Sequence, residues 1–322
     1  MSVRAVGRSI LQKSPTDVIV LSAVRSPITR AFKGGFKDAW LEDVLRPDVL
    51  IGNVLAELGF AKTGRMALLD CGFPASTTFH TINRQCSSSL QAITHQAHAI
   101  MAGQFDVALA GGVESMTRNY GSRGRPTDVS PSLRASNVKQ ATDCLLAMGE
   151  TSERVAQRYG ITRQEQDDFA FQSHHRALVA WNAGKFASEI VPVTYQAPSE
   201  TDKEGLLTTF TVPQDDGIRP NVRGCEPDEM GVGPALAIPA LYQYMGVGQY
   251  DVGVFEINEA FASQMVYCVR ALHLDVNKVN PNGGAIALGH PTGATGARQV
   301  ATLLAEMQRS DHELGVVSMC AR

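Results

Sequence analysis

Residues 83–112 read NRQCSSSLQAITHQAHAIMAGQFDVALAGG, and this stretch indicates the fold class. Apolar residues recur at helical spacing between Leu90 and Ile100, which predicts a helix over residues 86–102. The apolar run that follows at 106–110 has the length of a buried strand. A helix that leads directly into a buried strand is typical of a protein in which helices cover a parallel sheet.

Four other apolar runs of strand length extend this pattern along the chain. They lie at residues 17–23 (DVIVLSA), 48–54 (DVLIGNV), 250–257 (YDVGVFEI) and 314–320 (LGVVSMC). In the second half, helices are predicted over residues 259–272 and 293–308, the latter with one apolar face. Both halves place a helix that opens with small residues next to a buried strand. We therefore expect an α/β fold with an internal duplication.

The middle of the chain, residues 117–223, has a different texture. Arginines are spread through a stretch rich in Pro, Ser and Gly. Thr162 and Glu165 then form a capping box, which predicts a helix that ends at about residue 186. We expect a subdomain inserted over the sheet face. The predicted organisation is a tail or targeting segment (1–16), an N-terminal half (17–116), the inserted loop subdomain (117–223) and a C-terminal half (224–322).

The composition excludes several classes of partner. No apolar run in the 322 residues approaches the ~20 residues that a membrane span needs, and the net charge of −3 gives no overall attraction to nucleic acid. We expect neither a membrane nor a nucleic acid as partner. None of the six cysteines is spaced like a metal ligand, which predicts no metal site, no disulfide framework and a reducing compartment.

Cys86 stands where a loop is predicted to become a helix. The first-turn amides and the helix dipole there favour a thiolate over the usual thiol of pKa ~8.5, as a nucleophile requires. The alternative is a buried cysteine that packs as a small hydrophobic residue.

His290 lies in the glycine-rich stretch NGGAIALGHP (282–291), directly before a predicted helix. In this position its ring can project into a cleft and act as a base for Cys86, or simply pack at the turn. The loop lacks the G-x-G-x-x-G order of a dinucleotide site and the G-K-[ST] of a phosphate loop. Nucleotide binding is therefore poorly supported.

Two further polar residues follow predicted strands. Asn258 ends the run at 250–257, where its amide is either a donor to an oxyanion or a plain helix N-cap. Cys320 stands at the carboxyl end of the last run, where parallel sheets present site residues, although a lone cysteine there is more often part of the core.

Taken together and in this order, four motifs resemble the thiolase family. They are NRQCSSSLQA around Cys86, GGVESMT at 111–117, NEAFASQ from Asn258, and GGAIALGHPTGATGAR from Gly283, which is followed by VVSMC. The resemblance covers nearly the whole chain from residue 17. It implies a five-layered fold of two duplicated halves, with a loop subdomain that binds coenzyme A.

The resemblance also implies roles for individual residues. Cys86 matches the acylated nucleophile, His290 the histidine that activates it, Cys320 the second cysteine that moves a proton at the α carbon, and Asn258 an oxyanion-hole donor. Coenzyme A contacts or acyl-channel residues are expected at Met148, Arg219, Met230, Ala260 and Phe261.

The implied activity is cleavage of a 3-ketoacyl-CoA by coenzyme A, of the fatty acid β-oxidation type. NRQCSSS and GGFKD at 34–38 favour the eukaryotic 3-ketoacyl group over a biosynthetic thiolase that forms acetoacetyl-CoA. Coenzyme A and acyl-CoA are then the partners, with no permanently bound cofactor. A homodimer or higher homo-oligomer is expected in the peroxisome, or alternatively in the mitochondrion, although neither end of the chain carries a clear address.

The chain departs from the family pattern in three places. A unit of helix and strand is absent after Arg223, a full crossover helix is absent near Leu45, and the chain stops at Arg322 where relatives continue with a glycine-rich loop and a strand. We therefore expect an incomplete version of the fold. The hypothesis from a different class is an inactive, truncated thiolase-like protein that persists by pairing with an intact paralogue.

Overall fold

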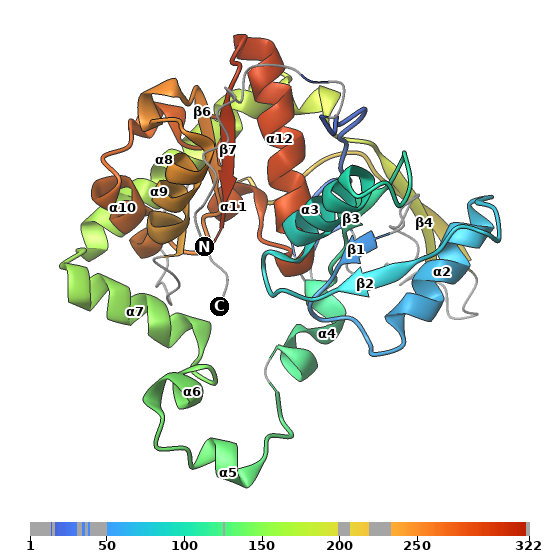
Figure 1. The fold of residues 1–322 in the computed structure, drawn as a ribbon, viewed down its shortest axis with the longest axis horizontal. Helices are drawn as coiled ribbons and strands as arrows, with labels where there is room; N and C mark the ends of the chain where they lie inside the picture. The colour runs from blue at the N-terminus through green and yellow to red at the C-terminus, as the bar shows by residue number, and fades with distance from the viewer. Residues whose placement is uncertain are drawn as a thin grey trace.

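The computed structural model describes residues 14, 17–30, 34–35, 38, 50–124, 126–198, 207–218 and 233–319. Two parallel sheets lie on either side of a central helix layer (Figure 1). That layer consists of α3 (Ser88–Met101) and α12 (Thr295–Ser310), which pack against each other. α3 also covers the first sheet and α12 the second.

The first sheet consists of β1 (Leu50–Gly52), β2 (His80–Ile82) and β3 (Ala110–Gly112), in the order β2-β1-β3. α2 (Phe60–Asp70) connects β1 to β2, and α3 connects β2 to β3. A side chain at Gly52 would place its Cβ 2.2 Å from the backbone nitrogen of Ser89. Glycine at this position therefore lets the first turn of α3 lie directly on the sheet.

The second sheet pairs β6 (Val254–Ile257) with β7 (Gly315–Ser318). Phe255 and Ile257 are fully buried and pack with Met265 of α10 (Ala262–Ala271) in the largest apolar core. The remaining elements of this half are α9 (Gly233–Met245), η2 (Gln249–Asp251), η3 (Val276–Lys278), α11 (Ala285–Leu288) and η4 (Thr292–Ala294).

The middle of the chain leaves the first sheet, forms three exposed helices and then packs against the second half. α4 (Met116–Arg123), α5 (Pro131–Arg134) and α6 (Lys139–Asp143) form an exposed excursion, which Figure 1 shows projecting below both sheets. α7 (Met148–Tyr159) and α8 (Arg163–Asn182) then pack against α10. η1 (Lys185–Ser188) and an antiparallel hairpin of β4 (Val193–Pro198) and β5 (Leu207–Val212) follow.

Except for the strand at 17–23, the predicted strands and helices are confirmed in their order, with shifted ends. The capping box of Thr162 and Glu165 is present and starts α8. The strand predicted at 106–110 lies instead at 110–112, because Gly111 and Gly112 rather than the preceding apolar residues pair with β1. No strand was predicted at β2 or in the β4-β5 hairpin.

One predicted strand is wrong. Residues 17–23 form no strand, and the neighbouring Arg25 makes only an isolated bridge with Ile190. Ile19 and Leu21 are 70% and 79% exposed. A β-strand exists only through pairing with a neighbour, and among the described residues this segment has none.

Candidate active site

Cys86 lies in the tight turn that enters α3 from β2. Its sulfur is buried, and the helix begins two residues later at Ser88. The Ser88 hydroxyl accepts a hydrogen bond from the backbone nitrogen of Arg84 at 2.9 Å and donates to the carbonyl of Gln85 at 2.5 Å. Gln85 itself has φ of 50°, a conformation that non-glycine residues adopt only when their surroundings impose it. The turn therefore holds the cysteine in one place.

Burial decides the protonation state of Cys86. Mainly through desolvation, and to a smaller extent through the nearby Glu114 carboxylate, the pKa of the thiol is raised to about 11, although a hydrogen bond from the backbone nitrogen of Cys86 lowers it. The expectation of a free thiolate is thus wrong for the unliganded protein. Cys86 precedes the first helical turn, and the cost of burying a charge exceeds the benefit of the helix terminus. A base must remove its proton.

His290 is held in the form that a base requires. Its Nδ1 lies 2.7 Å from the Thr295 hydroxyl oxygen, and that hydroxyl lies 3.2 Å from the Pro291 carbonyl, to which it can only donate. The hydroxyl therefore accepts from Nδ1–H, and Nε2 keeps its lone pair. Burial lowers the pKa of His290 to about 4, with a smaller contribution from the positive charge of Arg298. The ring is neutral at physiological pH.

Asn258 lies beside this lone pair. Its Nδ2 is 3.4 Å from His290 Nε2, and its backbone nitrogen donates to the Ser318 carbonyl of the neighbouring strand at 2.9 Å. The interpretation of Asn258 as an N-cap is wrong, because α10 begins at Ala262 with Phe261 at the N-cap position. The side chain is fully buried, and its Oδ1 has no hydrogen-bond partner among the described residues.

Glu114 joins the two halves of this site and was not identified from the sequence. One carboxylate oxygen accepts from the Thr292 hydroxyl at 2.8 Å and from the Gly293 backbone nitrogen at 2.9 Å, just past His290. The same carboxylate accepts from the backbone nitrogens of Val54 and Leu55 at the end of β1. The available signal was its position in GGVESMT directly after a buried strand, where site residues gather in parallel sheets.

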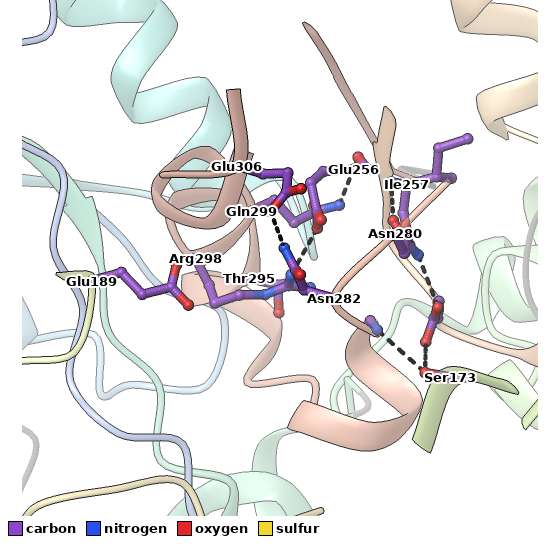
Figure 2. Close-up of polar contacts among 12 residues, drawn as sticks. Ser173, Glu189, Glu256, Ile257, Asn280, Asn282, Thr295, Arg298, Gln299 and Glu306 are labelled. Atoms are coloured by element: carbon purple, nitrogen blue, oxygen red, sulfur yellow. Dashed lines mark hydrogen bonds and ion pairs between the residues drawn. The ribbon is translucent and has the colours of Figure 1, made fainter. Parts of the chain in front are cut away.

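A second buried carboxylate shapes the histidine loop from the other side. Glu259 accepts from Ser173 Oγ at 2.6 Å, from Asn280 Nδ2 at 2.8 Å and from the backbone nitrogen of Ile286 at 3.1 Å, and Figure 2 shows part of this chain of contacts. A Cβ on Gly284 would lie 2.2 Å from the Glu259 side chain. The loop before His290 therefore needs a glycine there to fold around the carboxylate.

A buried ion pair anchors the helix after the loop. Arg298 of α12 donates to Glu256 of β6 at 2.9 Å, and Gln299 Nε2 donates to the Glu256 carbonyl at the same distance (Figure 2). Arg298 and Glu256 are both almost completely buried. Burial raises the pKa of Glu256 to about 8 although the charge of Arg298 opposes this shift, so the pair holds α12 against the sheet through its buried hydrogen bonds.

The structure brings some of the predicted site residues together and leaves others apart or undescribed. His290 and Asn258 are in contact, and Glu114 links their loop to the half that carries Cys86. Met148 is exposed at the start of α7, and Ala260 and Phe261 are half-buried before α10. Cys320, Arg219 and Met230 lie outside the described residues.

The described residues contain neither a cluster of metal ligands nor a membrane-spanning helix. In that part of the chain no group of three or more His, Cys, Asp or Glu side chains could hold a metal ion. No helix within the same residues is both long enough and apolar enough to cross a membrane.

Comparison with known proteins identifies the family. The Thiolase, N-terminal domain family matches residues 47–224, and the Thiolase, C-terminal domain family matches residues 218–322. Among curated proteins, the chain is 41% identical to the mouse 3-ketoacyl-CoA thiolase A, peroxisomal, over 96% of this chain and 89% of the mouse protein. It is 40% identical to the Arabidopsis thaliana 3-ketoacyl-CoA thiolase 2, peroxisomal, over 94% of this chain and 81% of that protein.

Solved structures of thiolases are also similar to this chain. The dimeric peroxisomal thiolase of Saccharomyces cerevisiae matches with a TM-score of 0.83 and 36% identity, over 97% of this chain and 96% of the yeast chain. Human mitochondrial 3-ketoacyl-CoA thiolase in complex with CoA matches with a TM-score of 0.74 and 29% identity, over 93% of both chains. A further structure of the yeast enzyme is described as five-layered and built from two core domains of identical topology.

The comparison also confirms that internal segments are missing. The alignment with the mouse protein extends over 384 residues, more than the 322 residues of this chain, so the mouse protein contains segments without a counterpart here. Both family matches, the identities above and the shared fold lead to one conclusion: the chain belongs to the thiolase family.

Proposed function

We propose that this chain is an acetyl-CoA C-acyltransferase that cleaves 3-ketoacyl-CoA with coenzyme A. The observation that carries the proposal is the contact of Asn258 Nδ2 with His290 Nε2, on a histidine whose Nδ1 is committed to Thr295. This arrangement supplies a neutral base and an amide donor at one point, as acyl transfer through a protonated thiol requires.

In the first half-reaction, His290 removes the proton of Cys86 and the sulfur attacks the 3-keto carbon. The bond between C2 and C3 breaks, the acyl group stays on Cys86 as a thioester, and the electron pair leaves on acetyl-CoA as an enolate. The enolate is protonated at C2, a step that the family resemblance assigns to Cys320. The amide of Asn258 donates to the enolate oxygen while it carries negative charge.

In the second half-reaction, the thiol of coenzyme A gives its proton to Cys320, which lost one to the enolate, and attacks the acyl-Cys86 thioester. The carbon–sulfur bond to Cys86 breaks, His290 returns its proton to the leaving sulfur, and the products are a shortened acyl-CoA and the free cysteine. No permanently bound cofactor is needed, because the cysteine carries the acyl group between the two steps. Contacts to coenzyme A are proposed for Met148, Arg219, Met230, Ala260 and Phe261.

The names of the relatives support the physiological setting. The mouse and Arabidopsis relatives are peroxisomal 3-ketoacyl-CoA thiolases, and the yeast structure is a dimer. A Bacillus anthracis acetyl-CoA acetyltransferase matches at 29% identity, below the 41% of the mouse protein. We therefore propose a homodimeric enzyme of peroxisomal β-oxidation rather than a biosynthetic thiolase or a mitochondrial one.

The test is direct observation of the acyl-enzyme. The purified chain is mixed with a 3-ketoacyl-CoA, quenched in acid and mapped by mass spectrometry. The expected result is a mass increase on Cys86 equal to the shortened acyl group, together with acetyl-CoA. Cys71 is an exposed free cysteine and serves as the control: Cys71→Ala should keep the acyl-enzyme and Cys86→Ala should lose it. Acetyl-CoA production by Cys86→Ala at the wild-type rate would refute the proposal.

A further inference from the structure

A large cavity lies next to the first sheet, and Glu114 and Pro291 of the candidate site are among its lining residues. Its volume is about 870 Å³. The rest of its lining comes from residues 17–30, from the segment 106–117 that contains β3, and from α3 and α12. Cys86, Asn258 and His290 do not line it.

Part of the lining is a sheet edge that pairs with no strand of the described residues. β3 is the last strand in the order β2-β1-β3. Its pairing with β1 uses the Leu109 carbonyl and the Val113 nitrogen, so the alternate residues Ala110 and Gly112 direct their N–H and C=O groups toward the cavity. An exposed edge of this kind is a template for another strand.

Residues 18–24 also line the cavity, and within the part of the chain that the structure describes no strand pairs with them. Among the described residues, none of the backbone groups of residues 18–24 forms a hydrogen bond with another backbone group. Four of their apolar side chains are exposed by more than half: Ile19, Val20, Leu21 and Val24. A sequence of this kind, with Val and Ile side by side, is a good strand former that here has no partner.

The helices on one face of the cavity are apolar and incompletely covered. Ile93, Ala97 and Ile100 of α3 line the cavity and remain only half-buried, although they form one face of an otherwise packed helix. Arg298 also lines it. Arg298 is 3% exposed and donates to Glu256 through Nη1, and its Nε and Nη2 have no acceptor among the residues that the structure describes.

We propose that this cavity is a slot that binds an extended β-strand from a second polypeptide. The outer edge of β3 and residues 18–24 both bring backbone N–H and C=O groups to the cavity lining, and a polypeptide can form hydrogen bonds with them whereas a hydrocarbon chain cannot. The strand places apolar side chains against Ile93 and Ala97, and one of its carbonyl oxygens accepts from Arg298. This mode of binding adds a strand to an existing sheet.

The internal segments that this chain lacks indicate the source of the strand. The mouse relative contains them within one polypeptide, whereas here the sheet ends at β3 beside an open slot. The occupant is therefore a segment of an intact relative of this chain, bound in trans. The inference does not depend on the proposed catalytic activity.

Peptide binding tests the inference. The probes are synthetic ten-residue peptides that tile the mouse segments without a counterpart here. At least one should bind the full-length chain saturably in fluorescence anisotropy and slow amide exchange at Ala110, Gly112 and residues 18–24. The inference is overturned if none protects these amides, or if residues 18–24 are already protected in the free protein, which would mean that this segment and β3 pair with each other.

Matched variants locate the binding. Ala97→Trp places a large side chain in the slot and should weaken peptide binding at least tenfold, whereas His95→Trp, at an exposed position on the same helix, should leave it unchanged. Ala110→Pro removes one outward N–H without breaking the ladder to β1 and should weaken binding independently. Equal binding by all three variants would refute the slot. Saturable binding of palmitate without peptide protection would likewise refute it in favour of an apolar ligand.

Discussion

The Glu114 carboxylate lies 2.9 Å from the backbone nitrogen of Gly293, and this contact joins the strand after the nucleophile helix to the loop that carries His290. The two residues are separated by 179 positions in the sequence. Cys86 and His290 sit in different halves of the chain, so their relative position depends on contacts of this kind.

Replacing Glu114 should therefore damage both stability and activity. Glu114→Ala leaves the Thr292 hydroxyl and three backbone N–H groups without their acceptor, and each unsatisfied buried group costs about 1–3 kcal/mol. We expect a lower melting temperature by calorimetry and a large fall in kcat. Glu57→Ala removes a carboxylate that is 77% exposed and should change neither. Equal effects of the two substitutions would contradict the role given to Glu114.

The contact of α3 with the sheet predicts a difference between two glycines. A methyl group at Gly52 would lie 2.2 Å from the Ser89 nitrogen, whereas nothing lies within 4 Å of one at Gly59. Gly52→Ala should destabilise the protein by about 1–3 kcal/mol or more, because backbone must move. Gly59→Ala should be nearly neutral in urea unfolding. A stable, active Gly52→Ala variant would show that the helix does not approach the sheet as described.

Thr295 should act through the tautomer of His290. Thr295→Val removes the oxygen that accepts from Nδ1–H, so the proton is no longer directed to that nitrogen. Since a positioned base contributes about 10²–10⁴-fold, kcat should fall within that range while KM changes little. Thr295→Ser keeps the oxygen and should retain most activity. A rise in KM with an unchanged kcat would assign Thr295 to substrate binding instead.

The low pKa of His290 makes stability depend on acidity. The folded protein holds a neutral ring down to about pH 4, whereas the unfolded chain binds a proton near 6.5. Stability from this residue is therefore fully present above pH 6.5 and lost as the pH falls toward 4. The loss is at most about 3 kcal/mol. His290→Gln should flatten that part of the curve in urea titrations at several pH values, and an unchanged slope would contradict the assignment.

Thiol labelling should follow exposure rather than catalytic role. Cys71 and Cys144 are exposed free thiols, whereas Cys86 is buried with its pKa raised to about 11. Iodoacetamide at pH 7.5 should label Cys71 and Cys144 first. Labelling of Cys86 should rise about tenfold per pH unit up to pH 11, because only the thiolate reacts. Rapid labelling of Cys86 at neutral pH would show that its thiolate is stabilised after all.

The elements that could be predicted are those whose pattern is local. The helix after Cys86 and the strand around Leu50 follow from apolar periodicity, and the capping box of Thr162 marks its helix without any knowledge of the fold. The strand expected at 17–23 failed because its partner is not a local property. Val18 and Ile19 have the right propensity, but within the described part of the chain no strand pairs with them.

In the candidate site, too, the features that lie within one sequence motif could be predicted, and those that depend on contacts between distant residues could not. Cys86, His290 and Asn258 were identified because each sits in a recognisable motif at the end of an element. The protonation state of Cys86 could not be predicted, because it depends on burial by residues distant in sequence. Glu114 was missed for a related reason, since its role exists only through contacts with Val54 and Gly293 across the chain.

Once the chain has folded, the packing of α3 on α12 holds the two halves together, so the covalent segment that joins them is not needed for this contact. Ser89 of α3 accepts a hydrogen bond from the backbone nitrogen of Ala297 at 2.9 Å, so the two halves hold each other directly. The exposed excursion through α5 and α6 contributes nothing to that contact. A protease that cuts there would leave two fragments that co-purify as one folded particle and separate only under denaturing conditions.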